Sequence, residues 1–143
     1  MNEPETIRTI LKTVKTVAVV GLSDRPGRPS LSVAHYLQQH GYRIVPVNPM
    51  AKSRTILGEP VFGALDEASA AVGDIDVVDV FRRPAAVPGV AEDAVAIGAK
   101  ALWLQLGVIN REGAESAHCA GLDVVMDRCL KVEWMRNAAT TPR

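Results

Sequence analysis

The stretch TVAVVGLSDRPGRPSLSVAHYLQQHGYRIVPVNP, residues 16–49, decides the fold class. It opens with the apolar run Thr16–Val20, turns at Gly21, and closes with a second apolar run, Tyr42–Val47. Between them, Ser30–His40 has apolar residues at i, i+3 and i+6, which predicts a helix with its first residue as N-cap. Two strands joined by a helix of this length predict a right-handed parallel βαβ unit.

The alternation of strand and helix continues along the chain. The apolar runs are apolar on both parities, which is typical of strands covered on both faces. The predicted strands are Thr16–Val20, Tyr42–Val47, Asp76–Phe81, Lys100–Leu106 and Asp123–Met126. The predicted helices are Thr6–Val14, Ser30–His40, 65–72, Pro84–Gly98 and Asn110–Ala120. This order predicts an α/β protein with a Rossmann-like, doubly wound parallel sheet of about five strands and helices on both faces.

The domain organisation follows from the length of 143 residues, which suits one compact domain. We expect a single domain over residues 1–136 and a flexible C-terminal tail over 137–143, where the sequence NAATTPR carries little apolar surface.

Composition excludes several function classes. The formal net charge is zero, which argues against nucleic acid or an anionic membrane as a partner. No apolar run approaches the roughly 20 residues of a membrane helix, and the polar N-terminus lacks a signal-peptide core, so a cytoplasmic protein is expected. Cys119 and Cys129 have no paired spacing, and the three histidines show no metal-binding pattern, so no metal site is assigned.

The loops after the predicted strands are rich in cations. In open α/β sheets, ligands bind at this carboxyl edge. Eight of the sixteen Lys and Arg residues lie in these loops: Arg25, Arg28, Lys52, Arg54, Arg82, Arg83, Arg128 and Lys131. Such a concentration in a neutral chain favours a ligand with several phosphates, although exposed loop charges are an alternative interpretation.

The first of these loops has the features of an anion site without a dinucleotide fingerprint. Gly21 allows a sharp turn after the strand, and the helix that begins near Ser30 offers free N–H groups to an anion. However, the loop is not G-x-G-x-x-G, and Asn48-Pro49 stands where an NAD-binding fold places Asp or Glu. An NAD(P)-binding protein is therefore the less favoured alternative.

Five segments carry a resemblance to a known family: VAVVGLSDRPGRPS, HGYRIVPVNP, DIDVVDVFRRP, GAKALWLQLGV and GLDVVMDRCLKVE. They resemble the stand-alone CoA-binding domain proteins, which are similar to the CoA-binding domain of the succinyl-CoA synthetase α subunit. The resemblance covers roughly residues 5–135 and implies coenzyme A as the ligand.

The resemblance also implies roles for individual residues. The residues that would hold phosphates at the first βα turn are Gly21, Ser23, Arg28 and Ser30. Those that would border the adenosine are Val47, Asn48 and Pro49. The edge of the third strand, against adenine and ribose, would be Val80, Phe81 and Arg82, with Arg83 as a further phosphate contact. The pantetheine side would be lined by Trp103, Gln105 and Gly107.

Several of these side chains also have a structural interpretation. Core packing is the favoured interpretation of Trp103, although it is compatible with a ligand contact. The alternative for Gln105 is a hydrogen bond with the backbone, and for the pair Arg82-Arg83 an exposed helix entry. Asp76 and Asp79 are interpreted as strand ends or caps.

The function implied is a module that binds CoA or an acyl-CoA as a carrier or regulatory unit. No catalytic residue is assigned, because Cys129 has no base placed by motif and the resemblance is confined to the binding half of the synthetase. A subunit or enzyme of CoA-thioester metabolism is the alternative, and a homodimer or a partner enzyme subunit both remain open.

Overall fold

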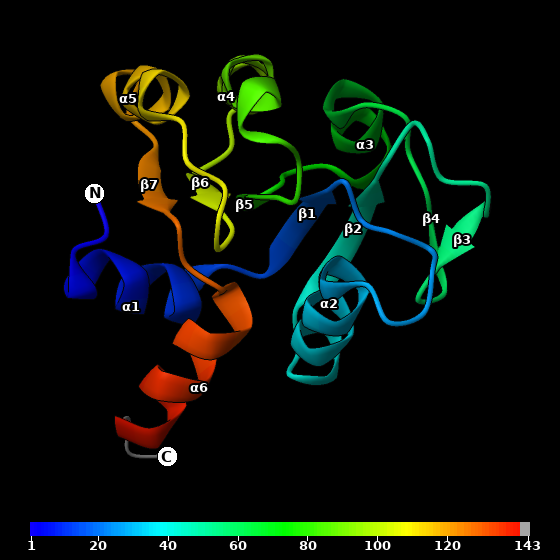
Figure 1. Ribbon diagram of the computed structural model, residues 1–143, viewed down its shortest axis with the longest axis horizontal. Coiled ribbons are helices and arrows are strands. Elements are labelled where there is room, and N and C mark those ends of the chain that lie inside the picture. Colours follow the sequence, from blue (N-terminus) through cyan, green and yellow to red (C-terminus); the bar gives the residue numbers. More distant parts are fainter. Residues whose placement is uncertain (141–143) are drawn as a thin grey trace.

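Five parallel strands form the central sheet of the computed structural model, which describes residues 1–140 (Figure 1). Their order is β2-β1-β5-β6-β7. The strands are β1 Thr16–Val20, β2 Arg43–Val47, β5 Val77–Val80, β6 Ala101–Leu104 and β7 Asp123–Met126. The predicted Rossmann-like, doubly wound sheet is confirmed, and each strand lies inside its predicted run.

The strand order places a topological switch point at the centre of the sheet. From β1 the chain moves outward to β2, and then returns to pair β5 against the other side of β1. Because the connections leave β1 and β5 in opposite directions, their carboxyl ends border an open crevice, which is where ligands bind in such folds.

Helices cover both faces of the sheet (Figure 1). On one face lie α1 Pro4–Thr13, α2 Pro29–Gln39 and α6 Leu130–Thr140. On the other lie α3 Leu65–Val72, α4 Val87–Ala96 and α5 Arg111–Cys119. A 3₁₀ turn, Pro84–Ala86, precedes α4. Asn110 caps α5 by accepting a bond from the N–H of Gly113. Among the described residues, no helix is long and apolar enough to cross a membrane.

The core has two halves, one on each face. In β1, Val17 and Val19 pack toward α1, α2 and α6, whereas Ala18 and Val20 pack toward α3, α4 and α5. All four are at most 5% exposed, which explains why the strand is apolar on both parities. Burying each of the three valines among them stabilises the fold by roughly 1.5–3 kcal/mol.

The structure corrects three details of the sequence analysis. Ser30 lies inside the first turn of α2, and the N-cap is Arg28 followed by Pro29. A short hairpin, β3 Thr55–Ile56 and β4 Glu59–Pro60, follows β2 and was not predicted. The helix α6 was also missed, and it runs through residues 137–140 of the expected tail. Residues 141–143 of that tail lie outside the described residues.

Both edge strands of the sheet have further partners. Beside β2, the N–H of Phe62 donates to the carbonyl of Pro46 at 3.0 Å, and Phe62 accepts from the N–H of Asn48 at 2.9 Å. Beside β7, the side-chain amide of Asn2 both donates to the carbonyl of Met126 at 2.8 Å and accepts from its N–H at 2.7 Å.

Candidate functional site

A cavity of about 390 Å³, which we call the crevice, opens at the carboxyl ends of β1 and β2. Its wall comes from the loops after these two strands, the first turn of α2 and the end of β5. The lining residues are Gly21, Ser23, Asp24, Arg25, Arg28, Pro29, Ser30, Asn48, Met50, Ala51 and Phe81. Six of the predicted site residues are therefore brought together: Gly21, Ser23, Arg28, Ser30, Asn48 and Phe81.

At Gly21 the backbone of the loop after β1 lies very close to the backbone at the end of β5. The φ angle of Gly21 is +90°, and its N–H donates to the carbonyl of Val47 at 2.8 Å. A Cβ at this position would collide with the carbonyl oxygen of Phe81 and lie 3.1 Å from Cδ of Arg82. Only glycine accommodates both the left-handed backbone and the proximity of the β5 exit. The aliphatic stem of Arg82 consequently lies beside Gly21.

The two serines of the crevice organise the loop that begins there. Oγ of Ser30, which is 5% exposed, accepts from the N–H of Ser23 at 3.0 Å. Oγ of Ser23 in turn accepts from the N–H of Arg25 at 3.1 Å. These bonds fold the loop back onto the start of α2, where the helix dipole favours an anion. In this first turn Pro29 has no N–H, and the N–H groups of Leu31 and Ser32 donate to the carbonyl of Arg28 at 3.1 and 3.2 Å.

Two side chains link the loop after β1 to the loop after β2. Asn48 donates from Nδ2 to the carbonyl of Leu22 at 2.9 Å and accepts on Oδ1 from the N–H of Met50 at 2.9 Å. Oδ2 of Asp24 accepts from the N–H groups of Ser53 and Lys52, at 2.9 and 3.1 Å. These bonds, the one from Ser53 above all, hold the pKa of Asp24 below its usual value.

The cations of the crevice are available to a ligand. Arg25 and Arg28 are exposed, and neither forms an ion pair with any described residue. Arg82 is half-buried and also has no ion pair in the described part of the chain, whereas Arg83 is exposed beside it. Several guanidinium groups without protein counter-charges suit an anion with more than one phosphate.

Other predicted site residues lie outside the lining of the crevice. Val47, Val80 and Trp103 are at most 3% exposed and belong to the core. Nε1 of Trp103 donates to the carbonyl of Arg128 at 2.8 Å, which shows the packing role that the sequence left open. Pro49 is exposed at the end of β2, outside the lining of the crevice.

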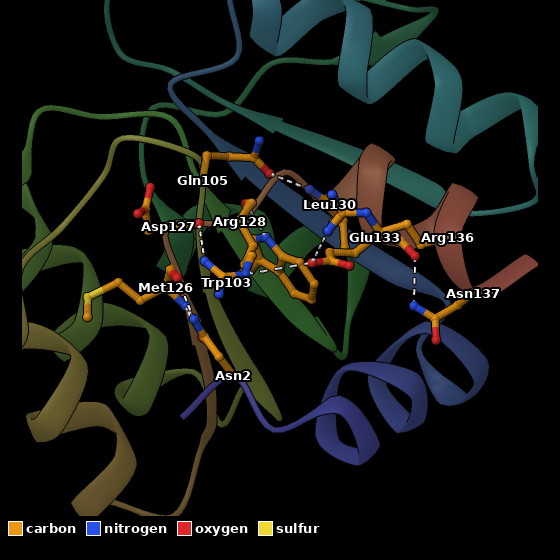
Figure 2. A network of polar contacts seen from close by, with 10 residues as sticks. All are labelled: Asn2, Trp103, Gln105, Met126, Asp127, Arg128, Leu130, Glu133, Arg136 and Asn137. Atoms are coloured by element: carbon orange, nitrogen blue, oxygen red, sulfur yellow. Dashed lines mark hydrogen bonds and ion pairs between the residues drawn. The ribbon is translucent and has the colours of Figure 1, made fainter.

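Gln105 and Gly107 connect the end of β6 to the segment after β7. Figure 2 shows Gln105 with Leu130. Gln105, which is 4% exposed, accepts on Oε1 from the N–H of Leu130 at 3.1 Å at the start of α6. Gly107 is exposed, and its N–H donates to Oδ1 of Asp127 at 2.7 Å. The interpretation that Gln105 forms a hydrogen bond with a backbone group is therefore confirmed.

A second cavity of about 380 Å³ lies on the same edge of the sheet, beside β6 and β7. Its lining residues are Leu106, Asp127, Arg128, Cys129, Val132, Glu133 and Arg136. The buried carboxylate of Glu133 accepts ion pairs from Arg128 at 3.8 Å and Arg136 at 3.6 Å (Figure 2). This cavity was not predicted from the sequence, because the helix α6, which supplies much of its wall, was not predicted.

Asp76, directly before β5, and Asp79, within β5, have very different surroundings. Burial alone would raise the pKa of Asp76, but hydrogen bonds from the N–H groups of Lys15 and Thr16, with Lys100, hold that pKa below its usual value. Asp79 is fully buried, and neither of its oxygens has a hydrogen-bond partner among the described residues. Burial raises the pKa of Asp79 well above its usual value. The interpretation as a cap is correct for Asp76 and wrong for Asp79.

Comparisons with known proteins identify the family of the chain. The profile described as CoA binding domain matches residues 15–135. The chain is 43% identical to the uncharacterized protein YneT of Bacillus subtilis (strain 168) over 126 residues, which are 88% of this chain and 90% of YneT. A hypothetical protein from Pyrococcus horikoshii OT3 superimposes with a TM-score of 0.87 at 37% identity, covering 95% of this chain and 92% of that one.

A larger enzyme contains a domain of the same fold. The dinucleotide-forming acetyl-coenzyme A synthetase 1 of Ca. Korarchaeum cryptofilum matches 79% of this chain with 26% of its own length, at 20% identity and a TM-score of 0.65. That likeness concerns the fold alone, whereas the profile match spans most of the sequence. The chain belongs to the CoA-binding domain family.

Proposed function

We propose that the crevice binds coenzyme A through its phosphates, and that the protein is a CoA-binding or acyl-CoA-binding module. The observation that carries this proposal is that one crevice combines Gly21, the α2 N-terminus and the cations Arg25 and Arg28, which form no ion pair with any described residue. Membership of the CoA-binding domain family supports this ligand over other polyphosphates.

The side chain of Asn48, which links the loops after β1 and β2, supports CoA over NAD as the ligand. In NAD-binding folds, an acid at the end of the second strand accepts a bond from the ribose hydroxyl. Here that position is Asn48, and its amide is already bonded to Leu22 and Met50. The side chain therefore serves the loops, and the usual ribose acceptor is replaced.

The long shape of CoA suits the extended edge of the sheet. Its phosphates lie between the nucleoside and the pantetheine arm, so a molecule whose phosphates occupy the crevice extends in two directions. We propose that the adenosine lies toward Asn48 and Pro49, and that the pantetheine arm lies toward Gly107. Phe81 and Arg82, at the end of β5, would contact the region between them.

We propose a carrier or regulatory role without catalysis by this chain. The hydroxyl oxygens of Ser23 and Ser30 both accept bonds from backbone N–H groups, which supports a role in shaping the loop. We also propose that the protein acts in the cytoplasm, because the described residues hold Cys119 and Cys129 as free thiols, as is usual in a reducing compartment. Catalysis on the bound thioester would fall to a partner subunit.

The test is binding of CoA, dephospho-CoA, NAD, NADP and ATP, measured by calorimetry and by thermal shift. CoA at about 100 times its Kd should stabilise the protein by about 2.7 kcal/mol. We expect CoA to bind more tightly than any of the others. A thermal shift with NAD and none with CoA would overturn the proposal.

Matched arginine variants separate the crevice from general charge effects. Arg28→Ala and Arg82→Ala should each weaken CoA binding about tenfold or more while leaving the unfolding temperature unchanged. Arg43→Ala is the control, since Arg43 is exposed at the amino end of β2, on the opposite edge of the sheet. An equal loss in all three variants would contradict a localised phosphate site.

A further inference from the structure

The second cavity continues the edge on which the crevice lies. Phe81, at the end of β5, lines the crevice, and Leu106, just beyond β6, lines the second cavity. The strands β5 and β6 are neighbours, about 4.8 Å apart. Backbone bonds also join the strand ends, from the N–H of Gln105 to Val80 and from the N–H of Arg128 to Leu104, both at 3.3 Å. The two cavities are therefore one strand position apart.

The wall of the second cavity combines aliphatic surface with charges that are already paired. Leu106 is 71% exposed and Val132 is 40% exposed, so both present apolar surface to solvent at the cavity. In contrast, Glu133 is paired with Arg128 and Arg136. Covering exposed apolar groups with an apolar part of a ligand contributes favourably to binding. Charges that are already in ion pairs contribute little to the binding of a further charged group.

From this arrangement we propose that the second cavity receives the acyl group of an acyl-CoA thioester, and that it favours short uncharged aliphatic acyl groups. The inference rests on the proposed function, because it needs the CoA phosphates in the crevice. A pantetheine arm that leaves the crevice past Gly107 points its terminal sulfur toward Leu106 and Val132. The acyl group attached to that sulfur then covers their aliphatic surface.

The expected preference for a longer acyl group is large enough to be measured as a difference in Kd. Each methylene removed from water contributes about fourfold to affinity. Butyryl-CoA has two methylenes more than acetyl-CoA, so it should bind up to about 15-fold more tightly if both are buried. Succinyl-CoA has the same chain length as butyryl-CoA but ends in a carboxylate, so it should bind more weakly than butyryl-CoA.

The experiment measures the Kd of CoA, acetyl-CoA, butyryl-CoA and succinyl-CoA for the wild type and three variants. Leu106→Ser and Val132→Ser should each remove the advantage of butyryl-CoA over CoA, with the two Kd values compared within the same variant. Ile109→Ser is the control, since Ile109 is 49% exposed and lines neither cavity. This control should retain the full advantage.

The outcomes separate this inference from the proposed function. Equal Kd values for CoA and butyryl-CoA in the wild type overturn the acyl site and leave the CoA site intact. Tighter binding of succinyl-CoA than butyryl-CoA overturns the aliphatic preference, because the arginines would then be recruiting the carboxylate. Absence of binding by CoA and by all three thioesters overturns the proposed function itself.

Discussion

Replacement of Asp79 by valine should stabilise the protein. The carboxyl group lies in the middle of the central strand β5 with both oxygens unpartnered among the described residues, between Val19 of β1 and Trp103 of β6. Burying a polar group without a hydrogen bond costs roughly 1–3 kcal/mol in proteins. We therefore expect Asp79→Val to raise the free energy of unfolding by about 2 kcal/mol at pH 7. For a chain of this length, that is about 6 °C in the unfolding temperature.

The gain should depend on pH with a definite sign. Burial raises the pKa of Asp79 in the folded protein above its value in the unfolded chain, which is about 3.9. Between these two values the folded state binds more protons, so the stability of the wild type falls as the pH rises above about 4. The valine variant lacks this loss. Its advantage should be smallest near pH 4 and should grow toward neutral pH.

Urea unfolding at several pH values, followed by tryptophan fluorescence, measures this difference. Asp76→Asn is the matched control, because the pKa of Asp76 is lowered in the folded state by its hydrogen bonds. That contribution is present above the unfolded pKa and is lost as the pH falls through the folded pKa. The control should therefore be destabilised most at neutral pH. If Asp79→Val destabilised the protein, or if its effect did not vary with pH, the carboxyl group would have to be ionised and partnered.

Substitutions at three further positions test the crevice and its supports. Gly21→Ala should destabilise the protein by about 2–4 kcal/mol in chemical denaturation, because the new Cβ meets the carbonyl of Phe81 at a positive φ; unchanged stability would refute the close approach. Asp24→Ala should weaken CoA binding by calorimetry because the two loops separate, and Asp24→Asn, which keeps an acceptor, should not; tighter binding by both variants would mean that the negative charge matters more than the link. Gln105→Leu should cost about 1 kcal/mol in urea unfolding, because it leaves the N–H of Leu130 unbonded. Unchanged stability would contradict this role.

The sheet was predictable because its strands are recognisable in isolation. Runs such as Val17–Val20 are apolar on both parities, and the helix between β1 and β2 shows its own period. Once the order of strands and helices is known, the handedness of βαβ units leaves few arrangements, and the carboxyl edge follows. That geometry alone places the loops of Gly21, Ser30 and Asn48 at this edge, whereas the roles of these residues toward CoA came from the family resemblance.

Elements held by distant contacts were missed. The helix α6 lacks a regular apolar stripe, and its start is fixed by Gln105 and by the bond from Trp103 to Arg128. The hairpin β3–β4 turns at Leu57-Gly58, and a leucine with φ of +55° is not a residue that signals a turn.

The structural roles of two polar residues were also not predicted, for different reasons. Asp24 gave no local signal, because the N–H groups it binds belong to a loop 28 and 29 residues further along the chain. Asp79 did give a signal, as an acid inside the apolar run Val77–Val80, but that signal was attributed to the end of a strand. Burial without a partner can be recognised only once the neighbouring strands are in place.

The side-chain amide of Asn2 occupies backbone hydrogen-bonding groups on the outer edge of β7. A bare edge strand offers peptide groups on which another chain can extend the sheet, a common first step of aggregation. At Met126 both the N–H and the carbonyl are already occupied by one side chain that imitates a peptide group. Loss of that amide, as in Asn2→Ala, would turn β7 into a template for intermolecular strand addition. The solution behaviour of the whole protein would then depend on a residue far from its proposed ligand.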